Sequence, residues 1–188
     1  MQRRQSERPA RAVDLMLDSG AFSAFTRGIK IDLGEYTEFV QEHLPLLLVY
    51  VNLDVIPGRP GGIASSAEVE EAAAASFKNY EVMRRAGLAP IPVFHMGESG
   101  EWLRRILDSG AEWIGLGGSV GKPNEARHQF FRRSFRVIEG ARRQVKVHGF
   151  GATTISTMLK FPWYSVDSTR WVMASAMGAI LVPAMKAR

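Results

Sequence analysis

The sequence predicts an α/β fold in which parallel strands alternate with helices and close into a TIM-type (β/α)8 barrel. Short apolar runs alternate with amphipathic stretches and no consecutive hairpins occur, a pattern typical of a parallel sheet. Polar residues or glycines also end strand after strand. In a barrel these ends meet on one face, whereas an open sheet uses mainly its switch-point strands, so we prefer the barrel. The strand-end residues are Asp18, Asp54, His95, Gly117, His148 and Asp167.

Length and composition set the broad class. The chain has 188 residues, of which 46% are hydrophobic and 23% charged, so we expect one globular, soluble domain over residues 12–188. Residues 1–11 are arginine-rich and are expected to form a basic, disordered leader. No apolar run approaches the roughly 20 residues of a membrane helix. The chain has no cysteine, which excludes disulfides and thiolate metal sites and fits a cytoplasmic location.

The charge balance indicates the kind of partner. A net charge of +5 and a pI of about 9.8 favour a polyanion such as nucleic acid, and we expect no membrane partner. Arginine pairs on expected helices could equally be solvated outer faces. No His, Asp or Glu set has a recognisable metal-ligand spacing, so we expect neither a metal nor another cofactor.

Seven strands and the helices between them are expected in order. The strand at 46–53 is almost purely apolar, which predicts burial on both faces. Capping sequences at Asp32 and Ser65 open two of the helices. Because an eighth strand is not recognisable before Asp18, we expect a barrel whose first strand is missing. The expected strands are 12–17, 46–53, 90–94, 113–116, 145–147, 162–167 and 179–182. The expected helices are 33–44, 66–85, 102–110, 126–141, 154–160 and 170–177.

The stretch Pro162–Thr169 is the centre of the functional interpretation. It is expected to form a short buried strand that presents Asp167 at its end, with Ser168 as the N-cap of the next helix. A helix N-terminus stabilises an anion, which suits a carboxylate nucleophile. The alternative is that Asp167 only caps the helix.

Asp18 and Asp167 are two carboxylates expected on one face of the barrel. In such a pair, one carboxylate can attack the anomeric carbon of a sugar as the nucleophile, and the other can transfer protons to and from the leaving group. Asp54 could accept hydrogen bonds from the edge of a base, and glycines after the strands allow a flat ligand or a phosphate to approach closely. Other interpretations remain open: Asp18 as a turn residue, Asp54 as a loop cap, and His95 and His148 as core histidines.

Six motifs, in order, resemble those of the tRNA-guanine transglycosylases. The resemblance covers roughly residues 15–171 and is closer to compact phage and bacterial relatives, some of which insert 7-deazaguanine bases into DNA. The motifs are Asp18-Ser19-Gly20-Ala21-Phe22-Ser23, Asn52-Leu53-Asp54, Pro92-Val93-Phe94-His95, Gly115-Leu116-Gly117-Gly118, Val147-His148-Gly149-Phe150-Gly151 and Trp163-Tyr164-Ser165-Val166-Asp167-Ser168.

The resemblance implies base exchange, in which guanine in a nucleic acid is replaced by a 7-deazaguanine base. Asp167 is implied as the nucleophile at C1′, Asp18 as the general base and Asp54 as the reader of the purine edge. The cysteine ligands of the tRNA enzymes' zinc site are absent, which favours DNA over tRNA. The implied substrate-binding residues are Ser19, Gly20, Asp54, His95, Gly97, Gly117, Gly118, His148 and Gly149.

Two other functions remain open. One is a non-catalytic or truncated barrel that only binds nucleic acid, and the other is a barrel enzyme acting on a free nucleoside or sugar phosphate. A homodimer or accessory proteins are also left open as partners.

Overall fold

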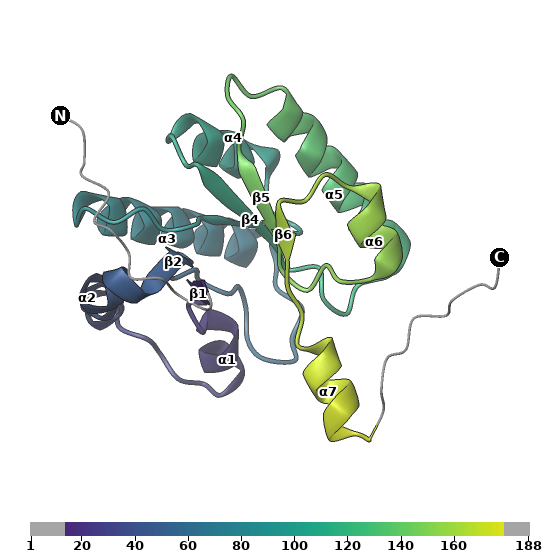
Figure 1. The fold of residues 1–188 in the computed structure, drawn as a ribbon, viewed down its shortest axis with the longest axis horizontal. Helices are drawn as coiled ribbons and strands as arrows, with labels where there is room; N and C mark the ends of the chain where they lie inside the picture. The colour runs from purple at the N-terminus through teal and green to yellow at the C-terminus, as the bar shows by residue number, and fades with distance from the viewer. Residues whose placement is uncertain (1–13, 179–188) are drawn as a thin grey trace.

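The computed structural model of the chain describes residues 14–178 and has a mixed α/β fold with parallel strands in two sheets (Figure 1). The smaller sheet has two strands and the larger has four, and every pairing between neighbours is parallel. The two-stranded sheet consists of β1 (Leu15–Leu17) and β2 (Leu47–Tyr50). The four-stranded sheet has the order β3 (Val93–His95), β4 (Trp113–Gly117), β5 (Lys146–Gly149) and β6 (Ser165–Val166).

The two sheets meet where β2 ends. Val51 forms a parallel bridge with Ile91, and the N–H of Asn52 donates to the carbonyl of Ile91 at 2.9 Å. The strands therefore follow one another from β1 to β6 in chain order. The alternating parallel arrangement that the sequence predicts is confirmed. The described residues form no closed barrel, and the strand expected at 179–182 lies outside them.

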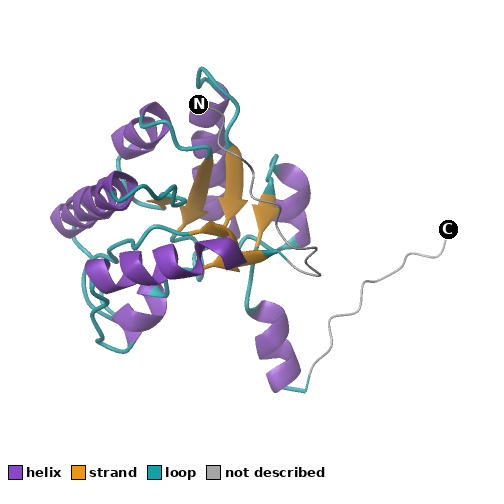
Figure 2. Ribbon diagram, turned by 60° about the vertical axis from the view of Figure 1, so that its left-hand side comes forward, coloured by secondary structure: helices purple, strands orange, loops and turns teal. Residues whose placement is uncertain are grey.

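Helices surround the strands, as Figure 2 shows, and α7 extends away from the rest of the described chain in both ribbon views. None of the helices within residues 14–178 has the length and apolar character needed to span a membrane. The helices are α1 (Ala21–Thr26), α2 (Leu33–His43), η1 (Leu44–Leu46), α3 (Ser66–Arg85), α4 (Gly100–Asp108), α5 (Asn124–Glu139), α6 (Ile155–Lys160) and α7 (Arg170–Ala176).

Capping side chains define where two of these helices begin. At α3, Ser65 accepts from the N–H of Glu68, and the Glu68 carboxylate accepts in return from the N–H of Ser65. At α2, the Asp32 carboxylate accepts from the N–H groups of Gly34 and Glu35 in the first turn. Both groups satisfy helix donors that have no intrahelical partner. The sequence predicts both helix starts correctly.

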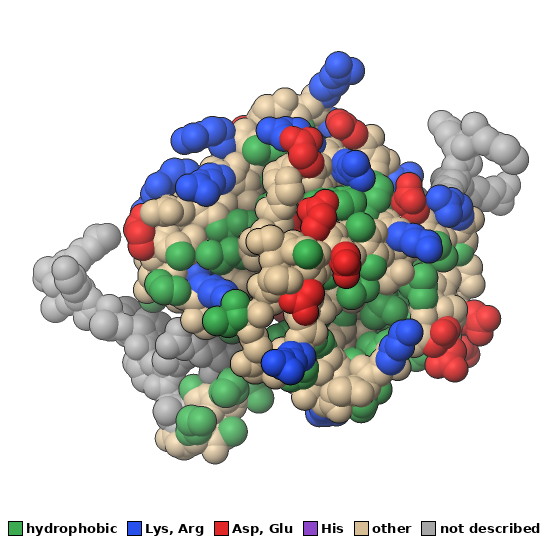
Figure 3. Space-filling model, turned by 180° about the vertical axis from the view of Figure 1, so that it is seen from behind, with side chains coloured by type: hydrophobic (Ala, Val, Ile, Leu, Met, Phe, Trp, Pro, Cys, Tyr) green, Lys and Arg blue, Asp and Glu red, His purple; other side chains and the backbone are tan. Residues whose placement is uncertain are grey.

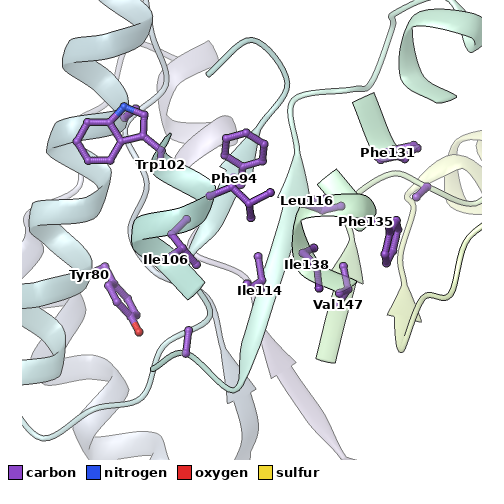
Figure 4. Packing of buried hydrophobic residues seen from close by; sticks show 14 residues of the cluster. Tyr80, Phe94, Trp102, Ile106, Ile114, Leu116, Phe131, Phe135, Ile138 and Val147 are labelled. Carbon is purple, nitrogen blue, oxygen red and sulfur yellow. The ribbon is translucent and has the colours of Figure 1, made fainter. Parts of the chain in front are cut away.

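The outer face of the larger sheet packs against helices and forms the main core. Successive side chains of a strand point to opposite faces, so every second residue of β3, β4 and β5 enters this core. Figure 4 shows these strand residues against side chains of α3, α4 and α5. The labelled members are Phe94, Ile114, Leu116 and Val147 from the strands and Tyr80, Trp102, Ile106, Phe131, Phe135 and Ile138 from the helices.

The inner face of the same strands carries candidate site residues that the sequence singles out. His95 pairs in register with Gly117, and Gly115 pairs with His148, which in turn pairs with Ser165. Because these positions alternate with the core residues, they face away from the helices that cover the outer side. The alternation therefore separates packing residues from candidate site residues.

Two predictions about burial are wrong. The strand predicted at 46–53 is not buried on both faces, because Leu48 is 45% exposed. The segment around Asp167 is not a buried strand either. Its regular part is only Ser165–Val166, which is partly exposed, because β6 pairs with a neighbour on one side only among the described residues.

The sequence also missed α1 and misplaced one helix cap. Helix α1 has only six residues, and Ala21 is its one buried residue, so no apolar periodicity marks it. Ser168 is not the N-cap of α7. That position is held by Thr169, whose side chain makes no capping hydrogen bond.

Candidate active site

Three carboxylates come together at the carboxyl ends of the strands. Asp18 follows β1, Asp54 follows the bridge after β2, and Asp167 follows β6. Their mutual influence is visible at Asp18, where the charges of both Asp54 and Asp167 help to raise its pKa. The structure therefore brings together the three acids that the sequence singles out.

Asp167 is an accessible anion. Its side chain is 54% exposed, and Oδ1 accepts a hydrogen bond from the N–H of Gly151 at 2.9 Å. Partial burial works to raise its pKa, but the His148 ring and the Gly151 N–H outweigh burial and hold the pKa below its usual value. The Asp167 carboxylate thus binds the loop after β5, a contact that a role as the cap of α7 does not require.

Asp18 has the opposite electrostatic setting. It opens to solvent, yet the protein atoms around it desolvate the carboxyl group and raise its pKa. The charges of Asp54 and Asp167 raise it further, because a second negative charge nearby disfavours ionisation. Asp18 therefore holds a proton more readily than Asp167 does.

His148 is buried beside Asp167. Its Nδ1 lies 2.8 Å from Oγ of Ser165, on the neighbouring strand. Its Nε2 lies 3.7 Å from Oδ1 of Asp167, which is too long for a hydrogen bond, and it has no hydrogen-bond partner among the described residues. The ring of Phe150 packs edge-on against it at 4.5 Å. His148 is thus held in place with one nitrogen directed toward the Asp167 carboxylate.

His95 lies between two carboxylates. Its Nε2 is 2.8 Å from Oδ2 of Asp54, and its Nδ1 is 3.1 Å from Oε1 of Glu98. Oδ1 of Asp54 accepts from the Ser19 hydroxyl at 3.1 Å. Each Asp54 oxygen therefore has one donor from the protein and retains a lone pair for a ligand.

The glycines after the strands differ in what surrounds them. A Cβ atom on Gly149 would lie 2.9 Å from the ring of Trp163, so glycine there is required by packing. A Cβ atom on Gly118 would lie 3.1 Å from the Met96 N atom, and its φ of +70° also favours glycine. Gly97 and Gly20 likewise have positive φ values. Contact of these backbones with a ligand stays a prediction.

The sequence interpretation missed three residues of this site. Glu98 follows His95 by three residues, and its side chain contacts the His95 ring. This short spacing is the sequence feature that could have predicted the contact. Ser165 was noted only as part of a motif. Tyr36, on α2, donates to the carbonyl of Val51 at 2.7 Å, and burial together with the charges of Asp18 and Asp54 raises its pKa. Only the tertiary structure brings Tyr36 to these acids.

Two carboxylates with opposite pKa shifts are suited to different chemical roles. The group that stays ionised can act as a nucleophile, and the group that keeps its proton can act as an acid and then as a base.

Within residues 14–178, no group of three or more His, Asp or Glu side chains could hold a metal ion. No protein-family model matches the chain, and no curated protein matches it either.

Proposed function

We propose that the chain is a base-exchange transglycosylase that replaces guanine in a nucleic acid by a 7-deazaguanine base, with DNA as the preferred substrate over tRNA. The observation that carries this proposal is the meeting of Asp18, Asp54 and Asp167 in one site with opposite pKa shifts at Asp18 and Asp167. The order of the motifs along the sequence supports the same reaction.

We also propose that the strands belong to a (β/α)8-type barrel. Neighbouring strands lie about 4.8 Å apart, so β1 and β6 in a flat arrangement of this order would be separated by about 24 Å. Charges at that distance are largely screened in water. The charge of Asp167 nevertheless acts on Asp18, which supports a sheet that curls until its outer strands approach each other.

Asp167 is the proposed nucleophile. An oxygen of its carboxylate forms a bond to C1′ as the bond from C1′ to N9 of guanine breaks, and the proton of Asp18 passes to the leaving base. Asp18, now ionised, takes the N9 proton of the incoming base, whose nitrogen then displaces Asp167 from C1′. Each step conserves protons and electron pairs, and the exposure of Asp167 leaves room for the sugar.

The distribution of cations favours approach of the nucleic acid to the carboxyl ends of the strands. Arg84 and Arg143 donate to the carbonyls of Ser109 and Ala111, between α4 and β4, at the opposite ends of the strands. Figure 3 shows Lys and Arg interspersed with Asp and Glu on the face opposite to that of Figure 1, without a single basic patch. The loops that follow strands at the site end carry the exposed cations Arg27, Lys30, Arg59 and Lys122.

Incubation with DNA or tRNA and labelled guanine or 7-deazaguanine tests the proposal. The unaltered chain is expected to incorporate label, and Asp167→Asn to lose at least about a thousandfold in rate, because the covalent intermediate cannot form. Asp108→Asn is the matched control, since Asp108 is an exposed aspartate at the end of α4. Mass spectrometry of the mixture is expected to detect a nucleic-acid adduct on Asp167.

Incorporation of label by Asp167→Asn at the normal rate would remove Asp167 as the nucleophile. Salt-dependent binding of nucleic acid with neither incorporation nor an adduct would instead favour a binding protein. Turnover of free nucleosides without any polymer would favour the third alternative.

A further inference from the structure

We propose that Glu98 is a positioning residue of this site, which keeps His95 as an imidazolium and thereby holds Asp54 and the turn that carries Asp18. The effect of Glu98 on catalysis rests on the proposed base exchange. The contacts that support it do not depend on that reaction, and its test includes a measurement that needs no activity.

Glu98 binds His95 at two points. One carboxylate oxygen, Oε1, lies 3.1 Å from Nδ1 of the ring, and the other, Oε2, accepts from the backbone N–H of His95 at 3.1 Å. The Glu98 side chain is only 7% exposed. Gly97, with a φ of +111°, provides the tight turn that returns Glu98 to the residue three positions before it. Glu98 is therefore a buried carboxylate whose two oxygens both bind His95.

The partners of the ring determine its protonation. Both ring nitrogens face carboxylate oxygens, and an ionised carboxylate only accepts hydrogen bonds. With both acids ionised, both nitrogens donate and the ring carries a positive charge. Burial by itself lowers the pKa of His95. The hydrogen bonds and charges of Asp54 and Glu98 outweigh burial and raise the pKa to about 10.

The contacts continue from His95 to the turn after β1. Asp54 accepts from His95 through Oδ2 and from the Ser19 hydroxyl through Oδ1. Oγ of Ser19 accepts in turn from the N–H of Ala21. Because Ser19 is the neighbour of Asp18, this chain of contacts sets the position of the proposed proton carrier.

The charge of Asp54 also contributes to the raised pKa of Asp18. The imidazolium of His95 offsets the Asp54 charge, and Glu98 keeps the imidazolium protonated. Loss of the His95 proton would leave Asp54 uncompensated beside Asp18, which disfavours the ionised form of Asp18 that must receive a proton.

Among residues 14–178, few titratable groups act on the residues of this series of contacts. Asp54 and Glu98 are the groups that act on His95, and the residue paired with His95 on β4 is Gly117, which has no side chain. Tyr36 reaches Asp18 and Asp54 from α2. Asp167 and His148 act on Asp18 from the side of β5 and β6.

An NMR titration of the His95 ring nitrogens tests the proposal directly. In the unaltered chain, we expect the signals of an imidazolium to persist until about pH 10. In Glu98→Gln, the loss of one carboxylate is expected to move the His95 transition about 1–3 pH units lower. Glu101→Gln is the matched control, because Glu101 is an exposed residue of α4 that pairs with Arg104, and its His95 titration is expected to be unchanged.

Activity provides the second measurement. If base exchange occurs, Glu98→Gln is expected to shift the alkaline limb of its pH profile downward by the same amount as the NMR transition. The acid limb, where His95 is charged in both proteins, is expected to stay in place. A purely structural role would lower the rate at every pH instead.

The outcomes separate the two proposals. Absence of exchange in the unaltered chain would overturn the proposed function, whereas the NMR titration would still decide the role of Glu98. A His95 transition unaffected by Glu98→Gln overturns the positioning role. Should that variant not fold, a neutral His95 ring in the unaltered chain at about pH 8 overturns it equally.

Discussion

At the scale of single residues, the surroundings of two aspartates give them different chemical properties. Asp167 receives a backbone N–H and lies near His148, which stabilise its ionised form. Asp18 lies among other carboxylates and is partly desolvated, which stabilises its protonated form. The two aspartates therefore differ in proton affinity because of their positions, since the side chains themselves are identical.

The raised pKa of Asp18 predicts a pH-dependent effect on stability. The folded chain binds this proton more tightly than the unfolded chain, so the free energy of unfolding falls as the pH rises from 3.8 through the folded pKa. Asp18→Asn cannot ionise and is expected to be more stable than the unaltered chain at about pH 7. Urea unfolding at both ends of this range measures the difference.

Below the ordinary aspartate pKa, both proteins carry a neutral side chain at this position. The stability difference is therefore expected to disappear at about pH 3, which serves as the internal control. A lower stability of Asp18→Asn at about pH 7 contradicts the prediction.

At the scale of elements, the inner face of β4 is shaped by the loop after β5. A Cβ atom on Gly115 would lie 2.5 Å from the Phe150 ring and 3.2 Å from Val93. The same Phe150 ring packs against His148. Glycine at position 115 thus lets the Phe150 ring approach the strand closely and pack against His148 beside Asp167.

Substitution of Gly115 by alanine is expected to destabilise the fold by about 1–3 kcal/mol, because the methyl group overlaps the Phe150 ring. Thermal or urea unfolding measures this loss. Combining Gly115→Ala with Phe150→Leu, which removes the ring, is expected to recover part of the stability. The base-exchange rate of the double variant is expected to stay below that of the unaltered chain, since His148 loses the Phe150 ring that packs against it.

Gly100→Ala is the matched control for this experiment. Gly100 begins α4, and a Cβ atom there meets nothing within 4 Å. Alanine is expected to leave stability unchanged or to raise it slightly, because alanine favours the helix over glycine. Equal effects of the two substitutions would contradict the packing explanation.

At the scale of the whole molecule, the two ends of the strands use their cations differently. At the amino-terminal ends, Arg84 and Arg143 bind backbone carbonyls beside α4. At the carboxyl ends, Arg59 and Lys122 lie exposed in the loops before α3 and α5. Arg59 and Lys122 are therefore cations that a polyanion approaching the site end would meet.

Nucleic-acid binding is expected to depend on these loop cations. Arg59→Ala and Lys122→Ala should each weaken binding and reduce the slope of log K against log salt by about one, since each removes one phosphate contact. Arg133→Ala, an exposed arginine on α5, is the control and is expected to change neither quantity. Titrations at several salt concentrations provide the measurement, and an equal loss in the control would contradict this orientation of the partner.

The local sequence was sufficient to predict the alternation of parallel strands and helices, the starts of α2 and α3, and the acids Asp18, Asp54 and Asp167 as strand-end residues. These features depend on neighbours in the chain: a capping side chain reaches only the next few N–H groups, and hydrophobic periodicity repeats within one element. The six-residue α1 escaped prediction because its only buried side chain is Ala21.

Tertiary structure alone decided which residues meet. Glu98 and Asp54 bind the same ring although 44 positions separate them in the numbering, and Asp167 binds the loop after β5, a contact that the sequence did not predict. It also left Leu48 exposed, because burial depends on which element packs over a strand. Pairing and burial arise between distant segments, so the pattern within one segment cannot determine them.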